Sequence, residues 1–223
     1  MDTNDKKRIR EYYDKFSPKL GDDIEIPNKR HERFKNHIRN VLSRGEEVLD
    51  LGCGVGITSH FMGRLGANVT AVDISPKNIE HAIKHRIQKN VTYLVGDITD
   101  LDLKQEYDGI VIWDAFEHIP QQYTDDLMWT INTRAKEKGS WVFLNIPDGR
   151  YIRAARKFIP DRLQIVDEAW DIEDIIQLFK MSDFELLSLD IYGINAVCQY
   201  NTFIFRRTRD IRNAHENALG AKA

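Results

Sequence analysis

The sequence predicts an α/β fold with a doubly wound, Rossmann-like and mostly parallel sheet that helices cover on both faces. Short β-branched or apolar runs alternate along the chain with segments in which apolar residues recur at helical spacing. Strands that alternate with helices pair in parallel, because a helix returns the chain to the same end of the sheet. Two further apolar runs near the C-terminal end have no helix between them, which predicts a closing antiparallel hairpin.

Five segments carry the apolar runs expected of buried strands: Glu47–Leu51, Val69–Val72, Val91–Val95, Ile110–Trp113 and Trp141–Ile146. Helical stripes lie between them: Ile57, Phe61 and Leu65; Ile79, Ala82, Ile83 and Ile87; Leu127, Ile131 and Ala135. Ser75 before Pro76 is a typical helix start, and Gly66 a typical helix end. The hairpin is expected from Phe184–Ile191 and Gln199–Phe205.

The flanking regions are less regular. Residues 1–45 predict amphipathic helices, one with Tyr12, Tyr13 and Phe16 and a second with Phe34, Ile38, Val41 and Leu42. Asp171 is a candidate N-cap for a helix that packs through Ile175, Ile176 and Phe179.

Composition excludes several classes of protein. The 32 Lys and Arg residues and 35 Asp and Glu residues give a net charge of −3, which argues against a polycation that binds nucleic acid over its whole surface. No apolar run approaches the ~20 residues of a membrane span, and the polar start does not resemble a signal peptide. Two cysteines, Cys53 and Cys198, are too few for a disulfide framework or a cysteine-rich metal site. We therefore expect a single-domain cytoplasmic protein.

The segment Val48–Gly56 carries the strongest motif, because its glycines follow a strand and precede a helix. Glycine lets the backbone turn sharply and approach a ligand, and the helix N-terminus offers free N–H groups to an anion. Asp73 ends the next strand, where a carboxylate is placed to accept hydrogen bonds from a ribose diol.

Two classes of cofactor use this geometry. The dinucleotide fingerprint G-x-G-x-x-G requires a third glycine at position 57, where this chain has Ile57, and Asp50 is unfavourable beside a pyrophosphate. A sulfonium ligand that carries an amino acid fits better. Its ammonium group can meet acceptors near Asp50 and Gly52, and its carboxylate can use the N–H groups of the loop.

The segment Asp50-Leu-Gly-Cys-Gly-Val-Gly56, followed by Ala71-Val-Asp-Ile-Ser-Pro76, resembles class I S-adenosylmethionine-dependent methyltransferases of the small-molecule type. Three further pieces resemble the family in the same order: Gly96-Asp-Ile98, Tyr107–Asp114 and Gly139–Asn145. The resemblance covers about residues 45–206. It implies a seven-stranded sheet whose last strand is inserted antiparallel, and S-adenosyl-L-methionine as the cofactor.

The resemblance also implies roles for single residues. Asp50, Gly52, Cys53 and Gly54 belong to the loop that holds the methionine part, although Cys53 itself is expected to be a packing residue. Asp73 and Ile74 resemble the ribose-binding acid and its adenine-packing neighbour, and Asp97 and Ile98 the pair that meets the adenine. A simpler role is open for Asp97, which can cap a turn through Thr99. Asp114 resembles a residue of the pocket floor near the methionine.

Two residues are candidates for the reaction itself. His118 follows the fourth strand and titrates near neutral pH, so it is a candidate base or acceptor-facing group. It can equally cap the next helix or bond a core carbonyl. Tyr13 resembles a residue of the N-terminal lid that closes over the cofactor, although aromatic residues at helical spacing also form ordinary core.

A cationic segment follows the fifth strand, with Arg150, Arg153, Arg156, Lys157 and Arg162. On a short helix, Arg153 shares a face with Arg156 or Lys157. Guanidinium groups favour carboxylate and phosphate, so the first four of these cations are candidate binding residues for a small anionic acceptor. The alternative is a solvated helix face.

We therefore predict one methyltransferase domain over residues 1–223, with a helical lid (1–45), a cofactor-binding core (46–146), an acceptor-specificity insert and helix (147–183) and a closing hairpin (184–206). The expected activity is methyl transfer to a small molecule, most readily to oxygen. N-methylation of an amino sugar or related amine and a non-catalytic cofactor-binding scaffold are the alternatives. Nucleic acid is not expected as a partner, because Trp113-Asp-Ala-Phe116 stands where an Asn/Asp-Pro-Pro-Tyr motif would. No metal site, membrane contact or oligomeric state is predicted.

Overall fold

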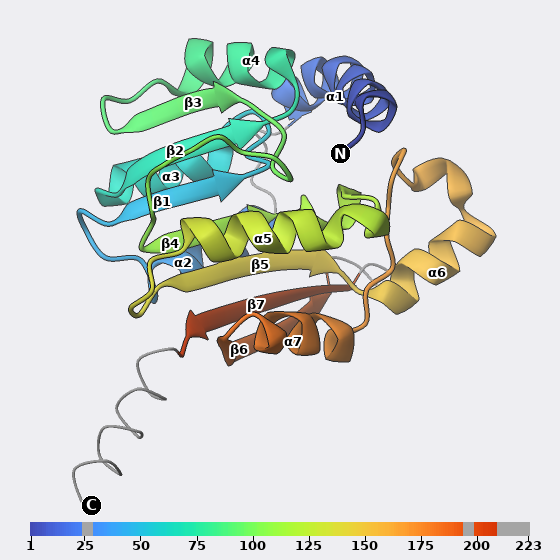
Figure 1. Cartoon of the computed structure of the whole chain (residues 1–223). Helices are drawn as coiled ribbons and strands as arrows, with labels where there is room; N and C mark the ends of the chain where they lie inside the picture. The colour runs from blue at the N-terminus through green and yellow to red at the C-terminus, as the bar shows by residue number, and fades with distance from the viewer. Residues whose placement is uncertain (24–28, 194–198, 209–223) are drawn as a thin grey trace, which may run out of the picture.

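The computed structural model describes residues 1–23, 29–193 and 199–208, and of residues 16–23 the backbone alone. A seven-stranded sheet with strand order β3-β2-β1-β4-β5-β7-β6 forms its centre (Figure 1). The strands are β1 (Glu47–Leu51), β2 (Asn68–Asp73), β3 (Val91–Val95), β4 (Gly109–Trp113), β5 (Trp141–Pro147), β6 (Phe184–Gly193) and β7 (Gln199–Arg207).

The sheet confirms the doubly wound topology. Strands β1 to β5 pair in parallel, and β7 lies antiparallel between β5 and β6. Strand order reverses between β1 and β4, since β2 lies on one side of β1 and β4 on the other. In open α/β sheets a crevice forms outside the carboxyl ends of the strands at this reversal, and ligands bind there.

Helices cover both faces of the sheet (Figure 1). They are α1 (Thr3–Asp23), α2 (Lys29–Ile38), α3 (Ile57–Leu65), α4 (Pro76–Arg86), α5 (Thr124–Arg134), α6 (Gly149–Phe158) and α7 (Ile172–Met181), with short 3₁₀ turns at Phe116–His118, Gln121–Tyr123 and Pro160–Arg162. Helices α2, α3 and α4 pack on one face, and α5 and α7 on the other. None of the helices in the described part of the chain is long and apolar enough to cross a membrane.

Neighbouring residues of one strand belong to two different cores. Val48 and Val111 pack with α2, α3 and α4, whereas Leu49 and Ile110, one position away, pack with α5 and α7. All four side chains are fully buried. Because successive side chains of a strand point to opposite faces, both faces must be apolar, and this explains the continuous apolar runs in the sequence.

The cap predictions give mixed results. Ser75 caps α4 by accepting a hydrogen bond from the Asn78 N–H at 3.1 Å, and Gly66 ends α3 in the left-handed conformation, as expected. Asp171 precedes α7 but makes no capping hydrogen bond. Its carboxylate instead accepts from Arg153 at 2.6 Å, which corrects that prediction.

The second N-terminal helix is shorter than expected. Helix α2 ends at Ile38, so Val41 and Leu42 lie beyond it, where they pack against the core as partly buried residues. The side chain of Phe16 and the whole of Cys198 lie outside the described residues.

Candidate active site

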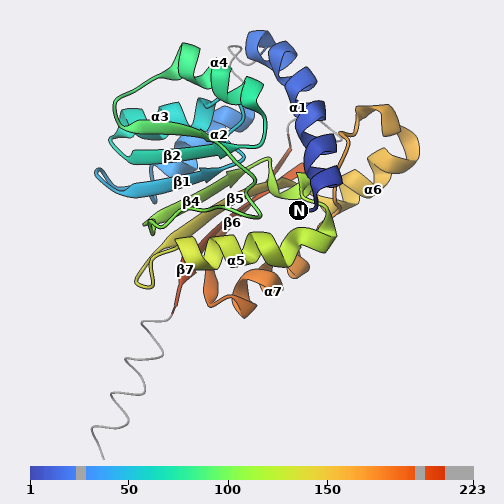
Figure 2. The ribbon, with the colours of Figure 1, turned by 45° about the horizontal axis from the view of Figure 1, so that its top comes forward.

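A cavity of about 260 Å³ lies at the carboxyl ends of β1, β2 and β4, where strand order reverses. Helix α1 crosses this edge of the sheet between α4 and α6 (Figure 2). The cavity is lined from several elements: Met1, Ile9 and Tyr13 of the N-terminal segment; Arg30 and His31 of α2; Gly52–Val55, Ile57 and Thr58; Asp73, Ile74 and Asn78; Asp97 and Ile98; Trp113–Ala115, His118 and Ile119; and Gln164. Most of the residues predicted for the cofactor therefore meet in one place.

The glycine loop takes backbone conformations that favour glycine. Gly52, Gly54 and Gly56 have φ angles of 75°, 54° and 83°. A Cβ atom on Gly52 would lie 2.4 Å from the Cβ of Ala115, so that position also needs glycine for space. The loop therefore lies directly against the end of β4 and exposes its backbone to the cavity.

Asp50 differs from its expected role. Its side chain is fully buried and does not line the cavity. One carboxylate oxygen accepts hydrogen bonds from the hydroxyls of Thr58, at 2.8 Å, and Ser59, at 2.5 Å. Burial raises the pKa of Asp50 to about 6. Asp50 thus ties the loop to the first turn of α3, behind the surface that a ligand would touch.

Asp73 lies in the cavity and holds the loop as well. One oxygen accepts from the Gly54 N–H at 2.9 Å, and the other from the N–H of Ser75 and the amide of Asn78, both at 2.9 Å. Burial raises the pKa of Asp73, although its hydrogen bonds oppose that shift. These contacts fix the carboxylate, so that it faces a ligand without rearrangement.

Ile74, Asp97 and Ile98 line the same end of the cavity. The two isoleucines offer apolar surface on which a planar ring can pack. Asp97 also accepts from the N–H and hydroxyl of Thr99, at 3.0 and 2.8 Å. Asp97 therefore caps the turn at Thr99 and lines the cavity at the same time.

Cys53 lines the cavity but is 7% exposed, and its thiol donates to the Gly54 carbonyl at 3.6 Å. Burial raises the pKa of this thiol well above its ordinary value. A thiol held in its neutral form is a weak nucleophile. Packing is therefore the role that its surroundings favour.

Asp114 ends β4 in an unusual conformation, with a φ of 53° in a residue other than glycine. Its Oδ2 accepts from the Arg30 guanidinium at 2.6 Å, and its Oδ1 accepts from the Asn145 amide at 2.5 Å. The Arg30 guanidinium also lies over the Tyr200 ring, 5.3 Å from its centroid. Since the left-handed region is costly for most side chains, these partners hold Asp114 at the cavity.

His118 is hydrogen-bonded through one ring nitrogen and lies near a carboxylate with the other. Nδ1 lies 2.7 Å from the Val166 carbonyl and 3.1 Å from an oxygen of Asp167, and Nε2 lies 3.8 Å from Glu117. Burial lowers the pKa of His118, but Glu117 and Asp167 outweigh it and raise that pKa to about 9. The sequence left open that His118 bonds a core carbonyl, and this contact is present. The His118 side chain also lines the cavity.

Glu117 completes this group of charges. Its side chain is buried, and its Oε2 has no hydrogen-bond partner among the described residues. Burial raises the pKa of Glu117 to about 8, against the attraction of His118. Because the pKa values of Glu117 and His118 are both raised, the two side chains together favour holding a proton between them.

Tyr13 connects α1 to the loop after α6. Its hydroxyl donates to the Gln164 side chain at 2.9 Å, and its ring lies 5.9 Å from that of His118. At the next residue of α1, Asp14 accepts a hydrogen bond from the Ser75 hydroxyl at 2.6 Å. Helix α1 is thus attached to both sides of the cavity that it covers (Figure 2).

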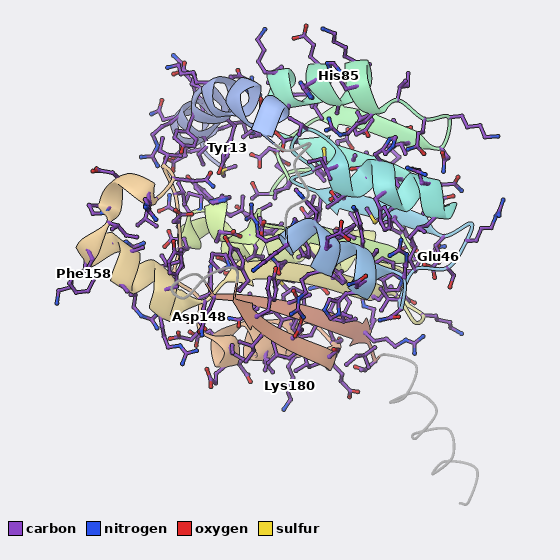
Figure 3. The ribbon with its side chains drawn as sticks, turned by 180° about the vertical axis from the view of Figure 1, so that it is seen from behind. Tyr13, Glu46, His85, Asp148, Phe158 and Lys180 are labelled. Atoms are coloured by element: carbon purple, nitrogen blue, oxygen red, sulfur yellow. The ribbon has the colours of Figure 1, made fainter. Side chains whose placement is uncertain are left out.

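The four cations predicted to bind an acceptor do not line the cavity. Arg150 bonds to Asp148 through two nitrogens at 2.9 Å each, and Arg153 bonds to Asp171 at 2.6 Å. Arg156 donates to the Asp167 carbonyl at 2.7 Å, and the Lys157 ammonium lies 5.2 Å from the centroid of the Phe158 ring. Figure 3 labels Asp148 and Phe158 at the two ends of α6, away from α1 and Tyr13. These cations lie outside the cavity, where carboxylates bind the guanidinium groups of Arg150 and Arg153 and a backbone carbonyl accepts from Arg156.

Sequence reasoning missed twelve of the residues that line the cavity, among them Arg30, His31, Trp113 and Gln164. The chain offered a weak signal for two of them, since Arg30 and His31 precede the apolar stripe of α2 without belonging to it. Their position depends on how the start of α2 docks against the end of β4. A local sequence pattern does not specify that docking.

The chain matches the model of a methyltransferase domain family over residues 1–189, and it belongs to that family. A mitochondrial ubiquinone biosynthesis O-methyltransferase of Schizosaccharomyces pombe is 36% identical over 113 residues, which are 48% of this chain and 40% of that protein. A ubiquinone biosynthesis O-methyltransferase of Xanthomonas campestris is 39% identical over 80 residues, 34% of each chain. The matches thus span less than half the length of these relatives.

Solved structures share the fold. Magnesium protoporphyrin IX methyltransferase from Synechocystis PCC 6803 with bound SAH has a TM-score of 0.74 at 18% identity, and the match covers 92% of this chain and 100% of that one. The 1,6-didemethyltoxoflavin-N1-methyltransferase of Burkholderia thailandensis, with bound S-adenosylhomocysteine, has a TM-score of 0.67 at 16% identity, covering 84% and 82%. The family and fold predicted from the sequence are confirmed.

Proposed function

We propose that this protein transfers a methyl group from S-adenosyl-L-methionine to an oxygen of a small-molecule acceptor. The observation that carries the proposal is that the cavity has two ends, one on each side of β1. Asp73 and Ile74 lie at the end of β2 and Asp97 and Ile98 follow β3 on one side, whereas Asp114 and His118 follow β4 on the other, where Arg30 of α2 pairs with Asp114. The relatives named as O-methyltransferases support oxygen as the acceptor atom.

The residues at the first end fit the methyl donor. Asp73 presents a fixed carboxylate to a ribose diol, and Ile74 and Ile98 present apolar surface to an adenine. The backbone of Gly52–Gly54 lines the cavity between these residues and β4, and it would hold the methionine part of the donor. When bound, the sulfonium supplies a methyl group that is already activated for displacement.

The protein then has to align the acceptor and exclude water. Helix α1 covers the cavity, and its attachment through Tyr13 and Asp14 closes it from above. Arg30 is the one arginine or lysine among the described residues that line the cavity. Arg30 already pairs with Asp114 at 2.6 Å, so an anionic acceptor would bind it only by displacing that carboxylate.

A labelled-methyl assay tests the proposal. Purified protein is incubated with methyl-labelled S-adenosylmethionine and a panel of phenols, catechols, benzoates and amines, and labelled product is separated from donor. We expect transfer to hydroxyl or carboxylate oxygen. Transfer to amines alone would favour N-methylation. Binding of S-adenosylhomocysteine without any transfer would favour a non-catalytic scaffold and contradict the proposal.

A further inference from the structure

We propose that His31, rather than His118, takes the proton from a hydroxyl acceptor; this inference rests on the proposed function. His31 is the third residue of α2 and lines the cavity directly after Arg30. Within the described residues no hydrogen bond or ion pair engages its ring. Its nitrogens are therefore available to a ligand in the cavity.

His118 is poorly suited to the same task. A backbone carbonyl can only accept a hydrogen bond, so Nδ1 must donate its hydrogen to Val166, 2.7 Å away. The other nitrogen lies 3.8 Å from the Glu117 carboxylate. Asp167 at 3.1 Å favours the protonated ring, and the Glu117–His118 pair holds a proton between them; a group that is already protonated cannot accept another.

The charges around the two histidines act in opposite directions. Burial lowers the pKa of His31, as do Arg30 and Lys35 of α2 and Arg86 of α4, whereas Asp114 at the end of β4 opposes them. The carboxylates beside His118 raise its pKa to about 9. The lowered pKa of His31 thus favours a neutral ring with a free lone pair, and the raised pKa of His118 favours its protonated form.

The position of His31 follows from its neighbour. The Arg30 guanidinium lies 2.6 Å from Asp114, so the start of α2 is fixed at the end of β4. Strand β4 lies on the other side of β1 from β2, which ends at Asp73. A donor that extends from Asp73 along the glycine loop would bring its methyl group toward the end of β4.

The acceptor O–H bond breaks and its proton moves to the free nitrogen of His31, as the oxygen forms a bond to the methyl carbon. The bond from carbon to sulfur breaks, and its electron pair stays on sulfur, which becomes a neutral thioether. The imidazolium of His31 then releases the proton to water.

A site-resolved NMR titration tests the protonation states without an acceptor. Protein labelled on its histidine rings is saturated with S-adenosylhomocysteine, and the His31→Gln and His118→Gln variants assign the two signals. We expect His31 to titrate below the ordinary 6.5 and His118 above it. A His31 signal that titrates above 6.5, or a His118 signal below it, would overturn the proposal.

Kinetics test the role itself, with catechol and 4-hydroxybenzoate as probe acceptors and release of S-adenosylhomocysteine as the signal. Loss of a general base costs roughly 10²–10⁴-fold in rate. We therefore expect His31→Gln to lower kcat at least ~100-fold, to abolish the acidic limb of the pH profile, and to change S-adenosylhomocysteine affinity less than ~3-fold. His118→Gln should keep the acidic limb. His85→Gln, on the exposed side of α4 (Figure 3), is the matched control.

A second variant guards against a structural effect of the substitution. His31→Ala should regain activity when imidazole is added to the solution, since a free base then fills the site. Wild-type turnover in His31→Gln, or no rescue of His31→Ala, would overturn the role of His31. A wild-type protein that transfers no methyl group to any acceptor would instead overturn the proposed function.

Discussion

Arg30 donates a hydrogen bond of 2.6 Å to Asp114, and this contact joins the start of α2 to the carboxyl end of β4. The two side chains are 29% and 17% exposed, so water screens their attraction only in part. Asp114 has a φ of 53°, and its other oxygen accepts from Asn145. One ion pair therefore positions both α2 and the strained residue of the cavity floor.

A double-mutant cycle should detect this coupling. We expect Arg30→Met to destabilise the protein by about 1–3 kcal/mol, the range for hydrogen bonds to charged groups, and Asp114→Asn by less. The coupling energy from urea denaturation of both single variants and the double variant should be about 1–2 kcal/mol. Arg33→Met removes a more exposed pair with Asp190 and is the control. Fully additive effects would show that Arg30 and Asp114 act independently.

Gly52 and Gly139 separate the effect of backbone strain from that of side-chain crowding. Gly52→Ala meets both a positive φ and a Cβ contact of 2.4 Å, whereas Gly139→Ala, with a φ of 69°, meets open space. We expect losses of roughly 3 kcal/mol and roughly 1 kcal/mol respectively in thermal or urea unfolding. Only Gly52→Ala should also weaken S-adenosylhomocysteine binding. Equal losses of stability would mean that contact with Ala115 is not what requires glycine there.

Stability should fall as the pH rises past neutrality. Carboxylates outweigh burial and raise the pKa of His118 from 6.5 to about 9, so the stabilisation is complete below 6.5 and is lost as the pH rises through about 9. Ionisation of buried Glu117, with a pKa raised to about 8, acts in the same direction. We expect wild type to lose on the order of 1–3 kcal/mol between pH 6.5 and pH 9.

The double variant with Glu117→Gln and His118→Gln removes both titrations. Its unfolding free energy, measured in urea at each pH, should be flatter than that of wild type over this interval. The same slope in both proteins would place the pH dependence elsewhere in the chain.

Helix α1 should open and close with ligand. The Tyr13 hydroxyl bonds to Gln164, and the Ser75 hydroxyl bonds to Asp14, so both sides of the cavity hold the helix. We expect S-adenosylhomocysteine to slow amide hydrogen exchange in residues 9–15, and Tyr13→Phe to speed its dissociation about 3- to 10-fold. If S-adenosylhomocysteine leaves amide hydrogen exchange in residues 9–15 unchanged, helix α1 does not act as a cover.

Much of this fold could be predicted, because its signals are local. The apolar runs of β1 and β4 reflect burial on both faces, and Ser75-Pro76 and Gly66 mark helix ends through their own backbone chemistry. The glycine loop and Asp73 were also identifiable, since spacing along two strands places them at one edge of the sheet.

The acceptor end could not be predicted in the same way. Charge spacing on α6 identified cations, but Asp148, two residues before Arg150, and Asp171, which the fold brings beside Arg153, bind two of them. Arg30 and His31 reach the cavity only because α2 packs across the sheet onto Trp113 and Phe143 through Phe34. Such long-range packing leaves no periodic trace in the sequence around the residues it positions.

Calorimetric titration of the purified protein with S-adenosylhomocysteine, and separately with NAD⁺, tests the central claim most directly. We expect one S-adenosylhomocysteine site per chain with micromolar affinity, weakened at least ~10-fold by Asp73→Asn, and no heat of binding with NAD⁺. No binding of S-adenosylhomocysteine at high micromolar concentration, or binding of NAD⁺ that depends on Asp73, would contradict the methyltransferase site described above.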